Sequence, residues 1–327
     1  MRDLRAGLVG FGVMGQNHAR VLSQLSGVEF IGVCDPMLEP GRQLFPFFRS
    51  TEELLAQGVD YCVVAVPTSA HLSVGLMLAE AGVHALIEKP LAGDLPSVAT
   101  LQAAFADASL VAGVGHIERF NAASQEARRR IDGGQLGDLI QVSTVRQGPF
   151  PGRLYDVGVG LDLATHDIDL TTWIARSEYG SLLGRTRHLI GHVHEDLLAI
   201  VGTLESGVIT NHLVNWLSPR KERSISIIGE RGMLQIDTLS SDLTFFENGS
   251  IPNEWGQVAQ FRGISQGDVT RYAFAKREPL LIEHESFRDA VLGESAEIVS
   301  LAEGAHTVRV ALAALESAST GLACRID

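Results

Sequence analysis

The sequence predicts two domains of different classes. The first is an α/β domain with a doubly wound parallel sheet, and the second is an α+β domain with a large open, mostly antiparallel sheet. Three observations carry this prediction: residues 1–118 alternate short apolar strands with helices, a glycine-rich turn follows the first strand, and residues 119–327 contain longer strand-like segments. A chain of 327 residues, 45% of them apolar, is long enough for two cores.

The first domain is read from its apolar runs and helix starts. Strands are expected at 6–9, 30–35, 61–66, 85–87 and 110–114, and helices at 14–25, after 50, at 69–81 and after 94. The uninterrupted apolar run at 61–66 is typical of a strand buried on both faces of a parallel sheet. Ser50 and Asp94 are expected to cap helices, because their side-chain oxygens can accept the first free N–H groups. The alternation predicts right-handed crossovers.

The second domain is expected to be an open sheet. Its predicted strands are 139–146, 197–205, 207–217, 224–228, 232–237 and 243–247, and its predicted helices are 122–131, 161–175, 282–292 and 302–319. One face of such a sheet lacks helices and must be buried in another way. The apolar strands around 197–204 and 208–217 therefore predict face-to-face pairing of subunits, as a homo-dimer or homo-tetramer.

Charge and cysteine content exclude some functions. The formal net charge of −13 argues against a nucleic-acid partner, because phosphate binding needs a basic face. Cys34, Cys62 and Cys324 form no metal-ligand spacing, and we interpret them as free thiols in a reducing, cytoplasmic compartment. No apolar run approaches the length of a membrane helix, and residues 1–12 are interpreted as the start of a first strand rather than a signal peptide.

The stretch Gly10-Phe11-Gly12-Val13-Met14-Gly15 has the pattern GxGxxG. It follows a predicted strand and opens a predicted helix, and Asp35 lies 35 − 15 = 20 residues further on. This context predicts a dinucleotide site: Gly10 permits a tight turn, Gly12 close approach of the pyrophosphate, and Gly15 close packing of helix and strand. Asp35 would accept hydrogen bonds from the ribose and repel a 2′-phosphate, which favours NAD over NADP. The alternative is a plain turn with a surface aspartate.

Two further segments are expected near the nicotinamide. Pro67 and Thr68 follow the third predicted strand, although Thr68 is equally consistent with a helix cap. The strand at 85–87 ends in Glu88-Lys89-Pro90, at the sheet edge where ligands bind. The predicted cofactor-binding residues are Gly10, Gly12, Val13, Met14, Gly15, Asp35, Pro67, Thr68, His71, Glu88 and Lys89.

Lys89 stands where a buried strand ends. An amine there can hold a substrate hydroxyl and stabilise negative charge as a carbonyl develops. Pro90 restricts the preceding residues, and the Lys89–Pro90 bond is a candidate cis peptide. The alternative is a solvent lysine beside a structural proline.

Residues 156–169 form the densest polar cluster of the chain. Asp162 and His166 are four residues apart, which places them on one helical face, and His166 could take a proton from a hydroxyl. Asp162 could orient the imidazole, and Asp169 could face the same site. A metal site and a helix-cap network are the alternatives.

The tetrapeptide Glu88-Lys89-Pro90-Leu91 after the glycine-rich fingerprint resembles the Gfo/Idh/MocA oxidoreductases, over essentially the whole chain. The resemblance implies a Rossmann domain, an α+β domain and the oxidation or reduction of sugars, inositols or related polyols. It also implies that Lys89 lies in the active site, that His166 of the DxxxH pattern is the catalytic histidine, and that Asp162 is its neighbour.

Three stretches, "GHIERFN", "GPFPGRLYDVGVGLDLATHDID" and "VNWLSPRKER", are similar to the UDP-N-acetylglucosamine 3-dehydrogenase subgroup. This likeness implies oxidation of the sugar 3-hydroxyl to a ketone with NAD. The implied substrate-binding residues are Lys89, Arg119, Asn121, Arg153, Tyr155, Asp162, His166, Asn215 and Trp216. Arg119 is as consistent with an interdomain salt bridge, Arg153 with a surface position, and Trp216 with the core.

One position departs from that subgroup, because Tyr155 stands where a second basic residue is frequent. A tyrosine can stack on a sugar or base but cannot neutralise a phosphate. An inositol or free-sugar dehydrogenase therefore remains an alternative. A hypothesis of another class is a non-catalytic NAD-binding sensor on the same fold, against which the presence of both Lys89 and His166 argues.

Overall fold

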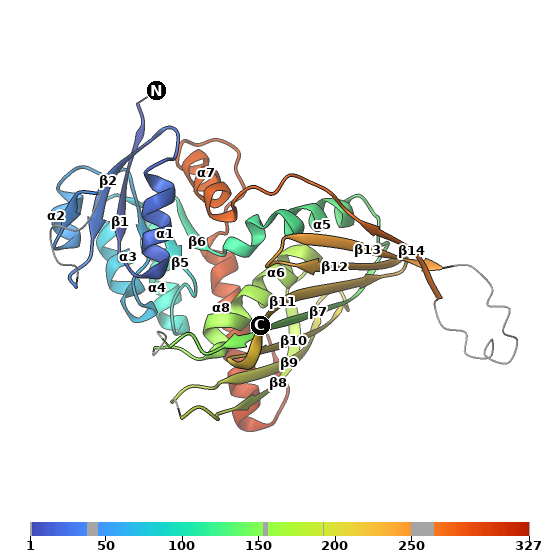
Figure 1. Ribbon diagram of the computed structural model, residues 1–327. Coiled ribbons are helices and arrows are strands. Elements are labelled where there is room, and N and C mark those ends of the chain that lie inside the picture. The colour runs from blue at the N-terminus through green and yellow to red at the C-terminus, as the bar shows by residue number, and fades with distance from the viewer. Residues whose placement is uncertain (1, 38–44, 153–155, 192, 250–264, 327) are drawn as a thin grey trace, which may run out of the picture. The chain divides into compact units, whose positions relative to one another are not determined.

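The computed structural model describes residues 2–37, 45–152, 156–191, 193–249 and 265–326. The chain divides into two compact units (Figure 1). The first unit comprises Met1–Phe120, Arg153–Asp169 and Glu278–Leu312, and the second comprises Asn121–Gly152, Leu170–Arg277 and Ala313–Asp327. The first unit thus takes in two segments from later in the chain.

The first unit contains a parallel sheet of six strands. They are β1 (Leu4–Val9), β2 (Val28–Cys34), β3 (Phe47–Phe48), β4 (Tyr61–Val64), β5 (His84–Glu88) and β6 (Ala112–Gly115), in the order β3-β2-β1-β4-β5-β6. Every pairing is parallel. The chain starts in the middle of the sheet and builds outward on both sides, so the strand order reverses between β1 and β4. The doubly wound fold is confirmed, and ligands are expected beyond the carboxyl ends of β1 and β4.

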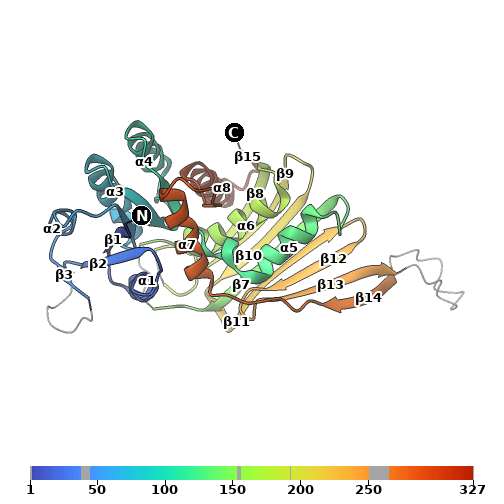
Figure 2. The same ribbon diagram turned by 90° about the horizontal axis from the view of Figure 1, so that it is seen from above.

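Helices cover both faces of this sheet (Figure 2). The helical elements of the first unit are α1 (Val13–Leu22), α2 (Thr51–Leu55), η1 (Thr68–Ala70), α3 (His71–Glu80), α4 (Leu95–Asp107), η2 (Ile117–Phe120), η3 (Gly160–Ala164), the start of α6 (Thr165–Ala175), α7 (Pro279–Val291) and the start of α8 (Leu301–Thr320). Side chains of β4 alternate between two cores: Tyr61 and Val63 pack with α1 and α7, whereas Cys62 and Val64 pack with α2, α3 and α4. Both faces are buried, as the apolar run predicted.

The predicted helix caps are confirmed in the first unit. The Ser50 side chain accepts a hydrogen bond from the N–H of Glu53, and the Asp94 side chain accepts one from Ser97. Thr68 is not a cap, because the N-cap residue of α3 is Ala70 and no side-chain bond caps that helix.

The second unit is built on a sheet of nine strands (Figure 1). They are β7 (Leu139–Pro149), β8 (Tyr179–Arg187), β9 (Leu197–Leu204), β10 (Ile209–Asn215), β11 (Leu217–Gly229), β12 (Gly232–Asp237), β13 (Asp242–Gly249), β14 (Ser265–Arg271) and β15 (Cys324–Arg325), in the order β14-β13-β12-β11-β7-β10-β9-β8-β15. Helix α5 (Ala122–Asp132) contacts β12 and β13. Within this sheet, the β7–β10 pairing is the only parallel one between described strands, so the mostly antiparallel sheet is confirmed.

Strand β8 was not predicted from the sequence. Two glycines, Gly180 and Gly184, interrupt its apolar pattern, and glycine is unfavourable in strands. The tertiary structure requires Gly184, because a Cβ there would lie 2.1 Å from the carbonyl oxygen of Ala314 in α8. The strand therefore forms because it pairs with β9 and packs under a helix.

The face of β8–β10 opposite α8 carries exposed apolar side chains. Leu183 is paired with Val201, and Ile209 follows the same face on β10. The exposed fractions of Leu183, Val201 and Ile209 are 37%, 57% and 44%. Single exposed apolar side chains are common on protein surfaces, but three large ones on one face form a patch. This face is therefore a candidate interface.

Candidate functional site

The glycine-rich turn joins β1 to α1. Gly10 has φ +95°, and a Cβ there would lie 2.4 Å from the carbonyl oxygen of Ala65. A Cβ on Gly15 would lie 2.2 Å from the carbonyl oxygen of Gly10. A Cβ on Gly12, by contrast, would meet no protein atom within 4 Å. Packing explains Gly10 and Gly15, whereas the open space at Gly12, at the N-terminus of a helix, fits an approaching phosphate.

Asp35 follows β2 directly and faces the glycine-rich turn. Its Oδ2 accepts a hydrogen bond of 2.7 Å from the N–H of Phe11, and its Oδ1 accepts one of 2.9 Å from Met37. A carboxylate offers about four lone-pair sites, so each oxygen keeps a further acceptor position. The backbone bonds orient the carboxylate, and the remaining sites can accept ribose hydroxyl groups.

The segment after β4 is held by contacts within the first unit. The N–H of Thr68 donates a hydrogen bond of 3.0 Å to Oδ2 of Asp156. His71 is 1% exposed, and its ring nitrogens lie 3.0 Å from the carbonyl oxygen of Pro90 and 3.1 Å from that of Val66. Burial lowers the pKa of His71 although the two carbonyl contacts raise it, and the ring holds one loop against the next. His71 therefore shapes the site from within.

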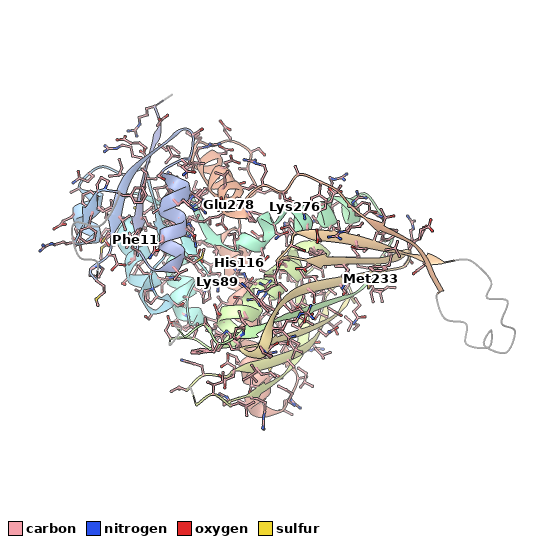
Figure 3. All side chains as sticks on the ribbon, viewed as in Figure 1. Phe11, Lys89, His116, Met233, Lys276 and Glu278 are labelled. Carbon is pink, nitrogen blue, oxygen red and sulfur yellow. The ribbon has the colours of Figure 1, made fainter. Side chains whose placement is uncertain are left out.

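Lys89 lies at the carboxyl end of the sheet, directly after β5 (Figure 3). The Lys89–Pro90 peptide is cis. The Lys89 Nζ donates two hydrogen bonds of 2.8 Å, one to Oδ1 of Asp162 and one to the Asp162 carbonyl oxygen. The side chains of Lys89 and Asp162 are 15% and 13% exposed. The lysine is therefore an oriented, ion-paired group, and the solvent-lysine alternative is wrong.

The segment expected as one regular helix, 161–175, begins instead with a π-helical turn, η3, and α6 follows from Thr165. The Asp162 carbonyl that binds Lys89 would accept the N–H of His166 in an α-helix. A side chain that bonds to a helix carbonyl competes with that ladder and favours local widening. Asp162 and His166 still lie in adjoining turns, but Asp162 directs its carboxylate to Lys89.

His166 is partly exposed at the start of α6. Its ring stands edge-on to that of His116, with centroids 6.5 Å apart. His116 is 1% exposed, and the positive charge of Lys89 acts on its ring. Burial lowers the pKa of His116, which keeps its ring neutral. A neutral imidazole thus lies beside His166 and adds no positive charge to it.

Arg119 binds two carboxylates of the first unit. Its Nε and Nη2 donate hydrogen bonds of 2.8 and 2.6 Å to Asp169, and its Nη1 donates one of 2.6 Å to Glu303. The side chains of Arg119 and Asp169 are 7% and 1% exposed. The structure thus uses Arg119 to neutralise a buried aspartate next to the histidines.

The other predicted substrate residues have different surroundings. Asn121 caps α5 and donates a hydrogen bond of 3.0 Å to the carbonyl oxygen of Thr238. Asn215 donates to Gln147 and accepts from the backbone after β10. Trp216 is 5% exposed. These three belong to the second unit, and Arg153 and Tyr155 lie outside the described residues.

Sequence reasoning missed the support of the site. Asp156, His116 and Glu303 were not predicted to act there. In the structure, Asp156 binds the backbone of Thr68, His116 lies beside the carboxylate of Asp169, and Glu303 pairs with Arg119. No sequence pattern could have found Glu303, which lies 184 residues from Arg119.

The arrangement is suited to hydride transfer between the carbon that bears a substrate hydroxyl group and a bound dinucleotide. One compact unit contains all four groups that this transfer needs. They are the open turn at Gly12 for a phosphate, the oriented carboxylate of Asp35 for a ribose, the ion-paired ammonium of Lys89, and the partly exposed imidazole of His166. Among the described residues, no group of three His, Cys, Asp or Glu side chains is placed to hold a metal ion. Nor does any described helix have the length and apolarity needed to cross a membrane.

Two successive segments of the chain match protein-family models. Residues 4–116 match the oxidoreductase family with an NAD-binding Rossmann fold, and residues 124–235 match the GFO/IDH/MocA C-terminal domain. The two matches are adjacent, come from the same family, and lie in the order that the fold requires.

Relatives with assigned activities align along the full chain. UDP-N-acetylglucosamine 3-dehydrogenase of Acidithiobacillus ferrooxidans is 29% identical over 97% of this chain and 96% of its own length. The NAD(+)-dependent scyllo-inositol 2-dehydrogenase of Bacillus subtilis is 24% identical over 99% of this chain and 97% of its own.

Solved structures show the same fold. A structure of the Acidithiobacillus ferrooxidans enzyme covers 98% of this chain and 99% of that chain, with TM-score 0.84 and 25% identity. The WlbA dehydrogenase from Bordetella pertussis, in complex with NADH and UDP-GlcNAcA, covers 100% and 98%, with TM-score 0.82 and 22% identity.

Proposed function

Because the chain belongs to the Gfo/Idh/MocA family of NAD-dependent oxidoreductases, we propose that it oxidises the 3-hydroxyl of UDP-N-acetylglucosamine, or of a related UDP-sugar, to a ketone. The observation that carries the proposal is the Lys89–Asp162 ion pair, which fixes an ammonium at the sheet edge used by ligands. The relative that aligns at 29% identity along the whole chain supports the choice of sugar.

The roles of the residues follow from their chemistry. NAD, when bound, supplies the hydride acceptor. The Lys89 ammonium can donate a hydrogen bond to the reacting hydroxyl and stabilise negative charge on its oxygen. His166 is the nearby imidazole suited to accept the hydroxyl proton, because its ordinary pKa lies near neutrality. Asp162 orients the Lys89 ammonium through the two hydrogen bonds described above, and Asp35 selects NAD over NADP.

The test is NADH absorbance when the purified protein is mixed with NAD and UDP-N-acetylglucosamine. A partner aminotransferase should trap the ketone, because oxidation of a secondary alcohol by NAD is often uphill. NADH formation should disappear in Lys89→Met and His166→Ala and persist in Lys276→Met, a partly exposed lysine that pairs with Asp242 on β13. No NADH with any UDP-sugar would refute the substrate assignment.

A second candidate is oxidation of an inositol. It is favoured by the scyllo-inositol 2-dehydrogenase that aligns over 99% of this chain. Parallel reactions with scyllo-inositol, myo-inositol and free sugars separate the two. NADH formed with an inositol, and not with the UDP-sugar, would move the assignment to this candidate.

We also propose that the protein pairs through the exposed face of β8–β10, as a homo-dimer or homo-tetramer. The apolar side chains of Leu183, Val201 and Ile209 support this, because pairing would remove them from water. Light scattering should give a multiple of the chain mass for wild type and a lower mass for Val201→Lys. Leu292→Lys, at the end of α7, is the control. A monomeric wild type would contradict the proposal.

We further propose a cytoplasmic location, which the free cysteines support.

A further inference from the structure

A buried chain of hydrogen bonds runs behind the catalytic lysine. Oε2 of Glu88 accepts the backbone N–H of Lys89 at 3.1 Å, and Oε1 lies 2.9 Å from Nε2 of His18. Nδ1 of His18 lies 2.8 Å from Nε2 of His284. The three side chains come from β5, α1 and α7, and the two histidines are 0% exposed. This series of hydrogen bonds therefore connects β5, α1 and α7.

The direction of these hydrogen bonds can be deduced. A carboxylate only accepts, so Nε2 of His18 donates to Glu88. Burial lowers the pKa of His284 well below its usual value, so that ring is neutral and carries one N–H. Nδ1 of His284 has no hydrogen-bond partner among the described residues. A buried N–H without an acceptor is rarer than a free lone pair, so His284 donates through Nε2 to Nδ1 of His18.

Glu88 is the charged end of this chain. Burial by itself would raise its pKa, but the hydrogen bond from His18 and the electrostatic attraction of His18 and Lys89 outweigh burial and lower it. The titratable groups around Glu88 are His18, His71, Lys89, His116, Glu283 and His284. Burial raises the pKa of Glu283 well above its usual value, so it is neutral. Burial lowers the pKa of His71, His116 and His284, as described above.

We propose that His18 is a positioning residue for Lys89: it holds Glu88 in place as a carboxylate, which in turn fixes the backbone of the lysine. His18 lies on α1, the helix that opens with the glycine-rich turn. The hydrogen bonds through His18 and Glu88 therefore connect the helix at the proposed cofactor site with the lysine at the end of β5. The inference rests on the proposed role of Lys89 in sugar oxidation. His284 completes the connection by fixing the ring of His18.

The kinetic test compares His18→Leu with His18→Gln. Leucine removes the donor to Oε1 of Glu88 and leaves only the backbone N–H of Lys89 at Oε2, so the pKa of Glu88 should rise, and kcat should fall about tenfold for each pH unit below the new value. The kcat should recover at alkaline pH, and KM for the sugar should stay near that of wild type. Glutamine can still donate to Glu88 and should restore most of kcat at neutral pH. Ser23→Ala, at the exposed end of α1, is the control.

Two kinetic results would overturn the proposal. One is an equal loss of kcat in His18→Leu at every pH, and the other is an equal loss in His18→Gln. Either would mean that His18 only packs the interior. These measurements use whichever sugar or inositol the wild type oxidises, so a wrong substrate assignment does not affect them.

A second measurement needs no turnover. In wild type the folded-state pKa of Glu88 is lowered, so its ionisation stabilises the fold above the unfolded pKa of about 4.3. In His18→Leu the folded pKa should be raised, so stability should be lost as pH rises above about 4.3. The difference in the free energy of unfolding between wild type and His18→Leu should therefore increase with pH. The same difference, measured in the Glu88→Gln background, should not increase. A gap independent of pH would overturn the proposal even if wild type oxidises no substrate.

Discussion

Replacing Arg119 with methionine should destabilise the first unit strongly. The change removes three charge-assisted hydrogen bonds and leaves the Asp169 carboxylate, 1% exposed, without its bidentate partner. Breaking a buried pair by removal of one partner costs about 3–5 kcal/mol, because the remaining charge is not compensated. We place Arg119→Met in that range, since Asp169 is almost wholly buried and a methionine of similar length cannot donate a hydrogen bond.

The assay is urea-induced unfolding followed by circular dichroism, with and without NADH. Arg119→Lys should fall between wild type and Arg119→Met, because an ammonium cannot reproduce the bidentate geometry. Arg129→Met is the matched control. Arg129 also pairs with a carboxylate, Glu126, but its side chain is 69% exposed. Surface pairs contribute about 0–1 kcal/mol, so the control should unfold close to wild type.

One result would refute this reasoning. If Arg119→Met unfolds within about 1 kcal/mol of wild type while KM for the sugar rises tenfold or more, Arg119 serves the substrate rather than the fold. That result would support the substrate role implied by the sequence resemblance.

Three further results are expected. Gly10→Ala should lose about 2 kcal/mol or more of stability and weaken NADH binding, because alanine is strained at φ +95° and its Cβ would meet a backbone oxygen at 2.4 Å; binding fluorescence and unfolding check both. Partly exposed Cys324 should react readily with a thiol reagent in the native protein, whereas Cys62 should react only after unfolding, since burial raises its pKa to about 12. Stability should fall as pH drops from about 6.5 towards about 3, because the unfolded chain protonates His212 while the folded chain, where burial lowers that pKa to about 3, does not; His212→Gln should flatten this part of the profile.

The sequence by itself determined the fold class and the glycine-rich turn of an NAD-binding domain. Local patterns encode both: an apolar run such as 61–66 is readable because both faces of its strand are buried, and the glycine-rich turn is readable because only glycine fits at Gly10 and Gly15. The 20-residue spacing to Asp35 follows from one helix and one strand of ordinary length. The position of Lys89 at the sheet edge followed from the same local logic, since the strand before it is short and apolar.

The tertiary structure alone decided how the residues that we propose as catalytic are held. Asp162 was expected to orient His166, four residues away, yet its carboxylate binds Lys89, 73 residues away, through a π-helical turn that no helical periodicity predicts. Likewise, neither the Arg119–Asp169–Glu303 network nor the chain from Glu88 to His284 has a sequence signature. The physical reason is that a buried charge needs a partner in space, and which partner it finds depends on how distant segments pack.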